Sequence, residues 1–176
     1  KHWMHRFYAG SWARSIFEQT MTREQYVESL SNMHHYVRQT TQHLGRAVAH
    51  APDRELRRHF VEHLNGEINH EISIENDLRH LGADPEYVMF HRAPSPATKA
   101  FMAIQETTIA FYRDPMLLMA CPLVAEGVTA NMPKQFVSCL RALVASWGIA
   151  KPEKATTFLT SHTHTDGGDD GHWQTT

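Results

Sequence analysis

The apolar residues of this chain recur at helical spacing, and no stretch alternates in the manner of a half-buried strand. Between residues 21 and 51 they fall three, four or seven positions apart, which predicts one long amphipathic helix with Thr22 as its N-cap. Pro52 then interrupts the chain, and Asp53 is a suitable cap for a second helix that continues to Leu81. The first half of the chain is therefore predicted to be a pair of long helices.

The second half of the chain carries repeated signals for the start of a helix. Ser95-Pro96 and Asp114-Pro115 each place a capping side chain before a proline, which predicts a third helix over residues 95–112 and a fourth from residue 114. A fifth helix is expected over residues 134–147 and a sixth from about residue 152. We therefore predict one all-α domain of about six helices that comprises residues 1–176.

Two further prolines bear on the fourth helix. Pro122 is expected to kink it, and Pro133 is expected to end it, because proline cannot donate a backbone hydrogen bond and its ring clashes with the preceding turn.

The second predicted helix has ionisable residues in the middle of an apolar row. Burying the Glu67 carboxylate costs several kcal/mol unless a partner or a cation compensates its charge. The Glu67-x-x-His70 spacing places two metal ligands on one helix face. In steps of three and four, the row comprises Leu56, Phe60, His63, Glu67, His70, Ile74, Leu78 and Leu81.

A slightly rotated helix gives an alternative reading of the same segment. The core row is then formed by Val61, Leu64, Ile68 and Ile72, and the ionisable residues lie at its edge, where they meet solvent. The Glu-x-x-His motif does not by itself decide between these two registers.

A second group of candidate ligands lies near the C-terminus. On a helix, His162, Asp166 and Asp169 share one face, and His172 lies one turn further along. This mixture of histidine and carboxylate suits Fe or Mn. The alternative is a solvated polar tail, which the glycines at positions 167, 168 and 171 favour.

Glu126 is a third candidate, because it is a single acid in a stretch of small and apolar residues. In a kinked helix, such neighbours leave room for a carboxylate that bridges metals beside a substrate. The alternative is that Glu126 lies on the outer face of the helix.

The composition of the chain argues against some classes of function. The chain has 17 Lys+Arg and 19 Asp+Glu, a net charge of -2, which argues against a dedicated nucleic-acid-binding protein. No apolar run approaches the roughly 20 residues that span a membrane. Two cysteines and the lack of a visible secretory signal predict a cytoplasmic protein. The 14 histidines stand out, since neutral imidazole is the commonest metal ligand.

The order and spacing of these motifs resemble a known family. The segment His63-Leu-Asn-Gly-Glu67-Ile-Asn-His70-Glu resembles the second core helix of haem-oxygenase-like di-iron oxidases, the iron-containing redox enzymes that share a fold with TenA and PqqC. Ala-Glu126-Gly and Phe-x-x-x-His162-x-x-x-Asp166 follow in the same order as in that family. The resemblance covers nearly the whole chain and implies a bundle of six to seven helices.

The resemblance also implies a ligand set for two iron ions. Its members are Glu67, His70, Glu126, His162, Asp166 and His172, with His35, His63 and Asp169 as second-shell residues or alternative ligands. The chain departs from the family's His-x-x-x-Asp-x-x-His motif at its end. In the register of His162, Asp169 replaces the last histidine; in the register of His172, Thr165 replaces the first.

The implied activity is that of a non-haem di-iron oxidase or oxygenase. Two Fe(II) ions would react with O₂ as co-substrate and oxidise a small metabolite similar to an amino acid or a fatty acid, with Glu67 and Glu126 as catalytic residues. An external electron donor can take part, and relatives often form homodimers. The alternatives are a metal-free oxidase or hydrolase similar to PqqC or TenA, and a haem-binding protein that uses His35.

Overall fold

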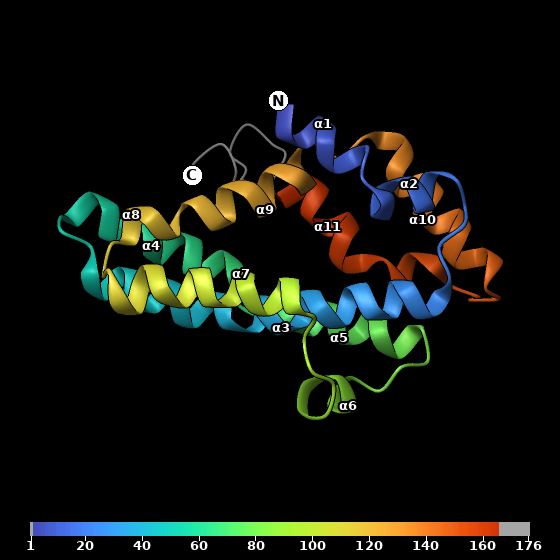
Figure 1. Ribbon diagram of the computed structural model, residues 1–176, viewed down its shortest axis with the longest axis horizontal. Coiled ribbons are helices and arrows are strands. Elements are labelled where there is room, and N and C mark those ends of the chain that lie inside the picture. The colour runs from blue at the N-terminus through green and yellow to red at the C-terminus, as the bar shows by residue number, and fades with distance from the viewer. Residues whose placement is uncertain (1, 166–176) are drawn as a thin grey trace.

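The computed structural model describes residues 2–165, and within this range it consists of helices without a strand (Figure 1). The all-α prediction is therefore confirmed. In chain order the elements are α1 (His2–Tyr8), α2 (Ser11–Phe17), α3 (Arg23–His50), α4 (Arg54–Glu67), α5 (His70–His80), α6 (Pro85–Phe90), α7 (Pro96–Glu106), the π-helix η1 (Thr107–Phe111), α8 (Pro115–Leu118), α9 (Ala120–Ala130), α10 (Lys134–Ser146), the 3-10 helix η2 (Pro152–Ala155) and α11 (Thr157–Thr165).

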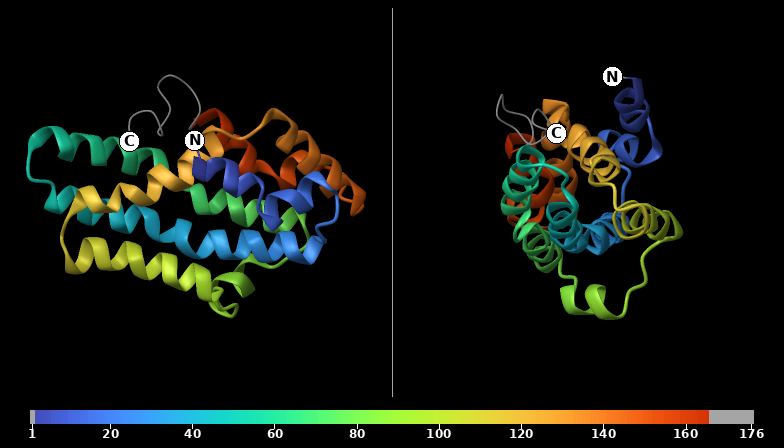
Figure 2. Two further views of the ribbon diagram at one scale, coloured as in Figure 1. Left: turned by 45° about the horizontal axis from the view of Figure 1, so that its top comes forward. Right: turned by 90° about the vertical axis from the view of Figure 1, so that its left-hand side faces the viewer.

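The long helix α3 is the axis of the bundle. It packs against α4 and α5 along one side and against α7 along another. Figure 2 shows α3 running the length of the molecule between these neighbours, with α6 projecting from the bundle. Helix α9 crosses the bundle and packs against α11. Segments from both halves of the chain therefore meet around the middle of α3.

Each predicted N-cap is confirmed. Thr22 accepts a hydrogen bond from the backbone of Gln25, whose side chain bonds back to Thr22, so that α3 begins with a complete capping box. Asp53, Ser95 and Asp114 cap α4, α7 and α8 in the same manner, each accepting from a backbone N–H in the first turn. These side chains determine where the helices begin.

The prediction of one continuous helix up to Leu81 is wrong. Helix α4 ends at Glu67, and Asn69 adopts the left-handed conformation with φ 71° before α5 begins at His70. Asparagine tolerates this conformation better than most residues, so a break occurs here without glycine or proline. Gly82 follows α5 with φ 70°, as expected of a glycine that ends a helix.

The predicted apolar row continues from α4 into α5 despite this break. Phe60, Ile74 and Leu78 are fully buried, whereas Val61, Ile68 and Ile72 of the alternative row are each more than 40% exposed. The alternative register is therefore wrong.

Two other predicted helices are also interrupted. The third continues past Glu106 only as the π-helix η1. The fourth divides at Met119 into α8 and α9, upstream of the expected kink at Pro122. Pro122 lacks the N–H that would bond to the carbonyl of Leu118, so the helical ladder is interrupted one turn before it. As predicted, α9 ends before Pro133, while α1, α2 and α6 were not predicted.

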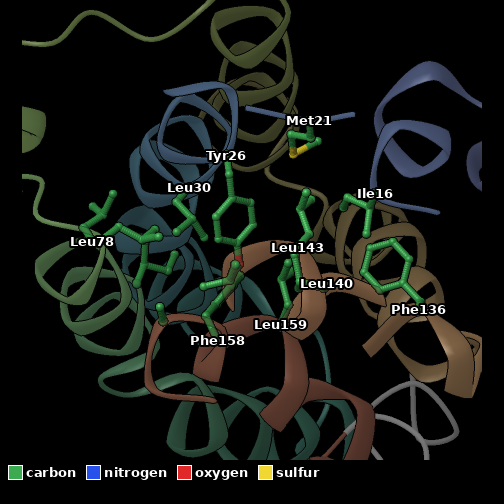
Figure 3. Close-up of a cluster of buried hydrophobic side chains, with 14 of the residues drawn as sticks. Ile16, Met21, Tyr26, Leu30, Leu78, Phe136, Leu140, Leu143, Phe158 and Leu159 are labelled. Carbon is green, nitrogen blue, oxygen red and sulfur yellow. The ribbon is translucent and has the colours of Figure 1, made fainter. Parts of the chain in front are cut away.

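The larger core lies between α2, α3, α5, α10 and α11. Figure 3 shows its side chains from these helices pointing into one cluster, with Tyr26 and Leu30 of α3 among them. A smaller core holds α4 against the second half of α3 around Leu44 and Phe60. The helices α4, α5 and α11, which carry Glu67, His70 and His162, are thus held in place by apolar packing.

Within the described residues, no single helix is long and apolar enough to cross a membrane. Two consecutive helical segments, Pro115–Ala130 and Gln135–Ser146, are together long and apolar enough, but the chain bends by 78° between them.

Candidate functional site

Five acidic and histidine side chains from four helices converge beside one cavity. Four of them are buried, and the His70 side chain is 18% exposed. They are His63 and Glu67 of α4, His70 of α5, Glu126 of α9 and His162 of α11. We refer to these residues as the His/Glu cluster.

The members of the His/Glu cluster contact one another in series. His63 Nε2 lies 2.8 Å from Glu126 Oε1 and 4.0 Å from Glu67 Oε1. The second oxygen of Glu67 lies 3.0 Å from His70 Nδ1, which is 3.2 Å from His162 Nε2. The carboxylate of Glu67 therefore lies between two histidines and is the central group of the cluster.

Three members have the geometry of a cation site. One ligand atom from each of His63, Glu67 and Glu126 lies within 4.8 Å of the other two. The Oε2 atom of Glu126 is buried and has no hydrogen-bond partner among the described residues. Because an unpartnered carboxylate oxygen is costly to bury, a bound cation would satisfy it. The donor set of nitrogen and oxygen atoms fits a divalent transition metal.

His162 is oriented by its own helix. Its ring Nδ1–H donates to the carbonyl of Phe158 at 2.7 Å, which leaves the Nε2 lone pair facing His70. Metal-binding histidines commonly use one ring nitrogen for such a backbone contact and the other for the metal. The ring of His162 is thus arranged as a ligand would be.

The position of α11 depends on a buried acid outside the cluster. Asp77 of α5 accepts hydrogen bonds from the backbone N–H groups of Thr157 and Phe158, each at 2.9 Å, and so caps α11. Burial raises the pKa of Asp77 to about 6, although these hydrogen bonds oppose the rise. One helix, α5, therefore both carries His70 and holds the helix of His162.

The histidines determine the charge state of Glu67. Burial acts to raise its pKa, but the hydrogen bond with His70 and the charges of His70, His63 and His162 outweigh it, so that the pKa of Glu67 is lowered. An ionised carboxylate at the centre of the cluster is the form that binds a cation.

The cavity beside the cluster has a volume of about 670 Å³. Most of the residues that line it are apolar, among them Val37, Phe101 and Leu118, and its polar lining includes His43 and Gln105 in addition to the cluster. This size suits a small organic molecule, whose apolar parts would contact these walls.

The structure brings together four of the predicted ligands, namely Glu67, His70, Glu126 and His162. His63, predicted as a second-shell residue or alternative ligand, belongs to the three-residue cation site. The remaining predicted ligands Asp166 and His172 and the alternative Asp169 lie outside the described residues.

His35 does not join the cluster. It is buried in α3, where its ring hydrogen-bonds with the backbone of Arg92, and it is not among the residues that line the cavity. His35 therefore lies apart from the candidate ligands that the structure brings together.

Two polar residues of the cavity, His43 and Gln105, were not predicted from the sequence. A signal for His43 existed, because it follows Tyr36 and precedes Ala47 at helical spacing and so falls on a buried face of α3. Gln105 had no comparable signal, since the register of α7 near its end is set by the transition into η1.

No known protein family, curated protein or solved structure matches this chain at a significant level. The resemblance to haem-oxygenase-like di-iron oxidases therefore stays a prediction from the sequence motifs.

Proposed function

We propose that this protein is an iron-dependent oxidase or oxygenase that oxidises a small, largely apolar metabolite with O₂. The observation that carries the proposal is the His/Glu cluster, in which two buried carboxylates and three histidines from four helices meet beside an apolar cavity. A bound cation would compensate the two carboxylates of such a group, and in helical bundles groups of this composition hold paired metals.

The order of contacts supports two adjacent metal positions that share Glu67. One position would use His63, Glu126 and the Glu67 oxygen that faces them. The other would use the opposite oxygen of Glu67 together with His70 and His162. Asp166, Asp169 and His172 follow His162 closely in the sequence and are further candidates for the second position.

Nitrogen and oxygen ligands without a cysteine suit Fe or Mn, and the resemblance to di-iron oxidases favours iron. Bound Fe(II) would supply the reactivity toward O₂. The protein's part is to hold the ligands and to bind the substrate next to them. The backbone contact of His162 fixes one ligand ring, and the apolar walls around Phe101 and Leu118 would hold the apolar part of a substrate.

The test is metal analysis after anaerobic loading with Fe(II), followed by exposure to O₂ and absorption spectroscopy. We expect about two irons per chain and a transient visible band after O₂ is added. Glu67→Ala and His70→Ala should each lose bound iron. Glu62→Ala and His80→Ala are matched controls, because these exposed residues lie on the same two helices. Unchanged iron content in both cluster variants would reject the proposal.

One contact favours a second candidate, a metal-free acid–base enzyme similar to PqqC or TenA. The 2.8 Å contact between His63 and Glu126 could orient the imidazole as a general base without a metal. The two candidates differ in their response to a chelator: activity that persists in metal-free protein, and is lost in His63→Ala, would support acid–base catalysis instead of iron chemistry.

A further inference from the structure

The cavity has a second polar feature, formed by residues of α3 and α7 that do not belong to the His/Glu cluster. His43 and Gln105 both line the cavity, and their exposed fractions are 3% and 6%. The Nδ1 atom of His43 and the Oε1 atom of Gln105 are buried without a hydrogen-bond partner among the described residues. We refer to these two atoms as the acceptor pair.

The contacts of His43 define the role of its free nitrogen. Its Nε2 lies 3.0 Å from a carboxylate oxygen of Glu106, and a carboxylate can only accept. Nε2 therefore carries a hydrogen, and when the ring is neutral its Nδ1 presents a lone pair. The hydrogen bond from Arg46, followed by that from His43, lowers the pKa of Glu106 and keeps it ionised as the acceptor in this contact.

Both atoms of the pair thus accept hydrogen bonds, and both lack a donor. Leaving such an atom buried and unsatisfied is unfavourable, because the atom has lost its hydrogen bond to water. A ligand that brings a donor into the cavity would remove this cost, whereas a ligand whose polar group only accepts would not. The pair therefore discriminates between ligands by the type of their polar group.

We propose that the cavity binds an apolar small molecule with a hydroxyl group, which donates its hydrogen to Gln105 or to His43. This inference rests on the proposed function only in naming the molecule as the substrate. With the donor group held between α3 and α7, the apolar body of the molecule lies along the remaining walls. Its carbon atoms, and not its polar group, are then presented to the His/Glu cluster.

The experiment is calorimetric titration of the metal-free chain with two probes of equal composition. They are 1-octanol and its isomer 1-methoxyheptane, which has an oxygen but no donor. We expect 1-octanol to bind at least about tenfold more tightly than 1-methoxyheptane. Equal affinities, or no binding of any probe up to its solubility, would overturn the inference.

Variants of Gln105 and His43 test whether these residues cause the preference for a ligand with a donor. In the double variant Gln105→Leu/His43→Leu the preference for 1-octanol over its isomer should shrink to within about threefold, because both acceptors are lost. Gln135→Leu is the matched control, since Gln135 is exposed on α10. If the double variant fails to fold by circular dichroism, the two single variants decide, because at least one of them should reduce the preference. A preference that persists in the folded double variant, or that is unreduced in both single variants, contradicts the role of the pair.

Iron loading separates this inference from the proposed function. Gln105→Leu should bind as much iron as the unaltered chain, because Gln105 is not a member of the His/Glu cluster. If the unaltered chain binds no iron but still prefers 1-octanol, the proposed function fails and the acceptor pair stands. If iron binds but the preference for 1-octanol is absent, the inference about the acceptor pair fails and the proposed function stands.

Discussion

Glu67 and Asp77 are two buried acids on neighbouring helices, and their surroundings act on them in opposite ways. Glu67 lies between His63 and His70, and its pKa is lowered; Asp77 contacts backbone N–H groups in the apolar core, and burial raises its pKa to about 6. Burial alone therefore does not mark a functional acid. The partners do, because histidines keep Glu67 ionised and available to a cation, whereas Asp77 holds a helix in place.

The largest expected effect concerns the apolar region around Asp77. Leu78→Ala removes a fully buried side chain from the larger core and should lower the free energy of unfolding by about 2–5 kcal/mol. Ile72→Ala, on the exposed side of the same helix, should change it by less than about 1 kcal/mol. Urea denaturation measures both values. Comparable losses would mean that the assigned register of α5 is incorrect.

The next effect is the pH dependence that Asp77 confers. Its folded pKa of about 6 exceeds the unfolded value of 3.8, so its contribution to stability is fully present below pH 3.8 and is lost as the pH rises through 6. The loss should be on the order of 3 kcal/mol. It is measured as the difference in unfolding free energy between the unaltered chain and Asp77→Asn across this range. If this difference in unfolding free energy does not change with pH, Asp77 is solvated.

Glu67 should give the opposite pH dependence. Its folded pKa is lowered, so its contribution is present above its unfolded pKa, ordinarily near 4.5, and is lost as the pH falls through the folded value. The measurement compares the unaltered chain with Glu67→Gln in the presence of a chelator. If the unaltered chain gained stability relative to the variant on acidification, Glu67 and Asp77 would behave alike and the contrast would fail.

The smallest effect tests the junction between the two regions. Asn69→Ala should cost about 1 kcal/mol, because alanine is less tolerant of the left-handed conformation, while Asn69→Gly should be tolerated. The alanine variant should also bind Fe(II) more weakly, since the break determines how His70 meets Glu67. Thermal unfolding and iron titration of both variants check this, and equal behaviour of the two would argue for a continuous helix.

Much of the fold was predictable because its signals are local. Four helix starts could be identified from their capping residues, because each cap acts through hydrogen bonds within the first turn. These residues are Thr22, Asp53, Ser95 and Asp114. The break at Asn69 was not predictable in this way, because the apolar row continues across it and asparagine is only a weak signal for a helix end.

The candidate site was predictable only as a list of residues. Glu67 and His70 stood out because they interrupt an apolar row, but the contact of His63 with Glu126 depends on how α9 crosses the bundle. Sequence spacing within one helix contains no information on that crossing. The same reason applies to Gln105, whose burial follows from the packing of α7 against α3.

The cap that Asp77 places on α11 also limits how far His162 can move. The ring lies four residues beyond the second anchored N–H, which is about 6 Å along a helix axis. With so short a lever arm, a tilt of about 10° at the anchored end displaces His162 by only about 1 Å. A small tilt of α11 about its capped end therefore leaves this histidine within reach of His70.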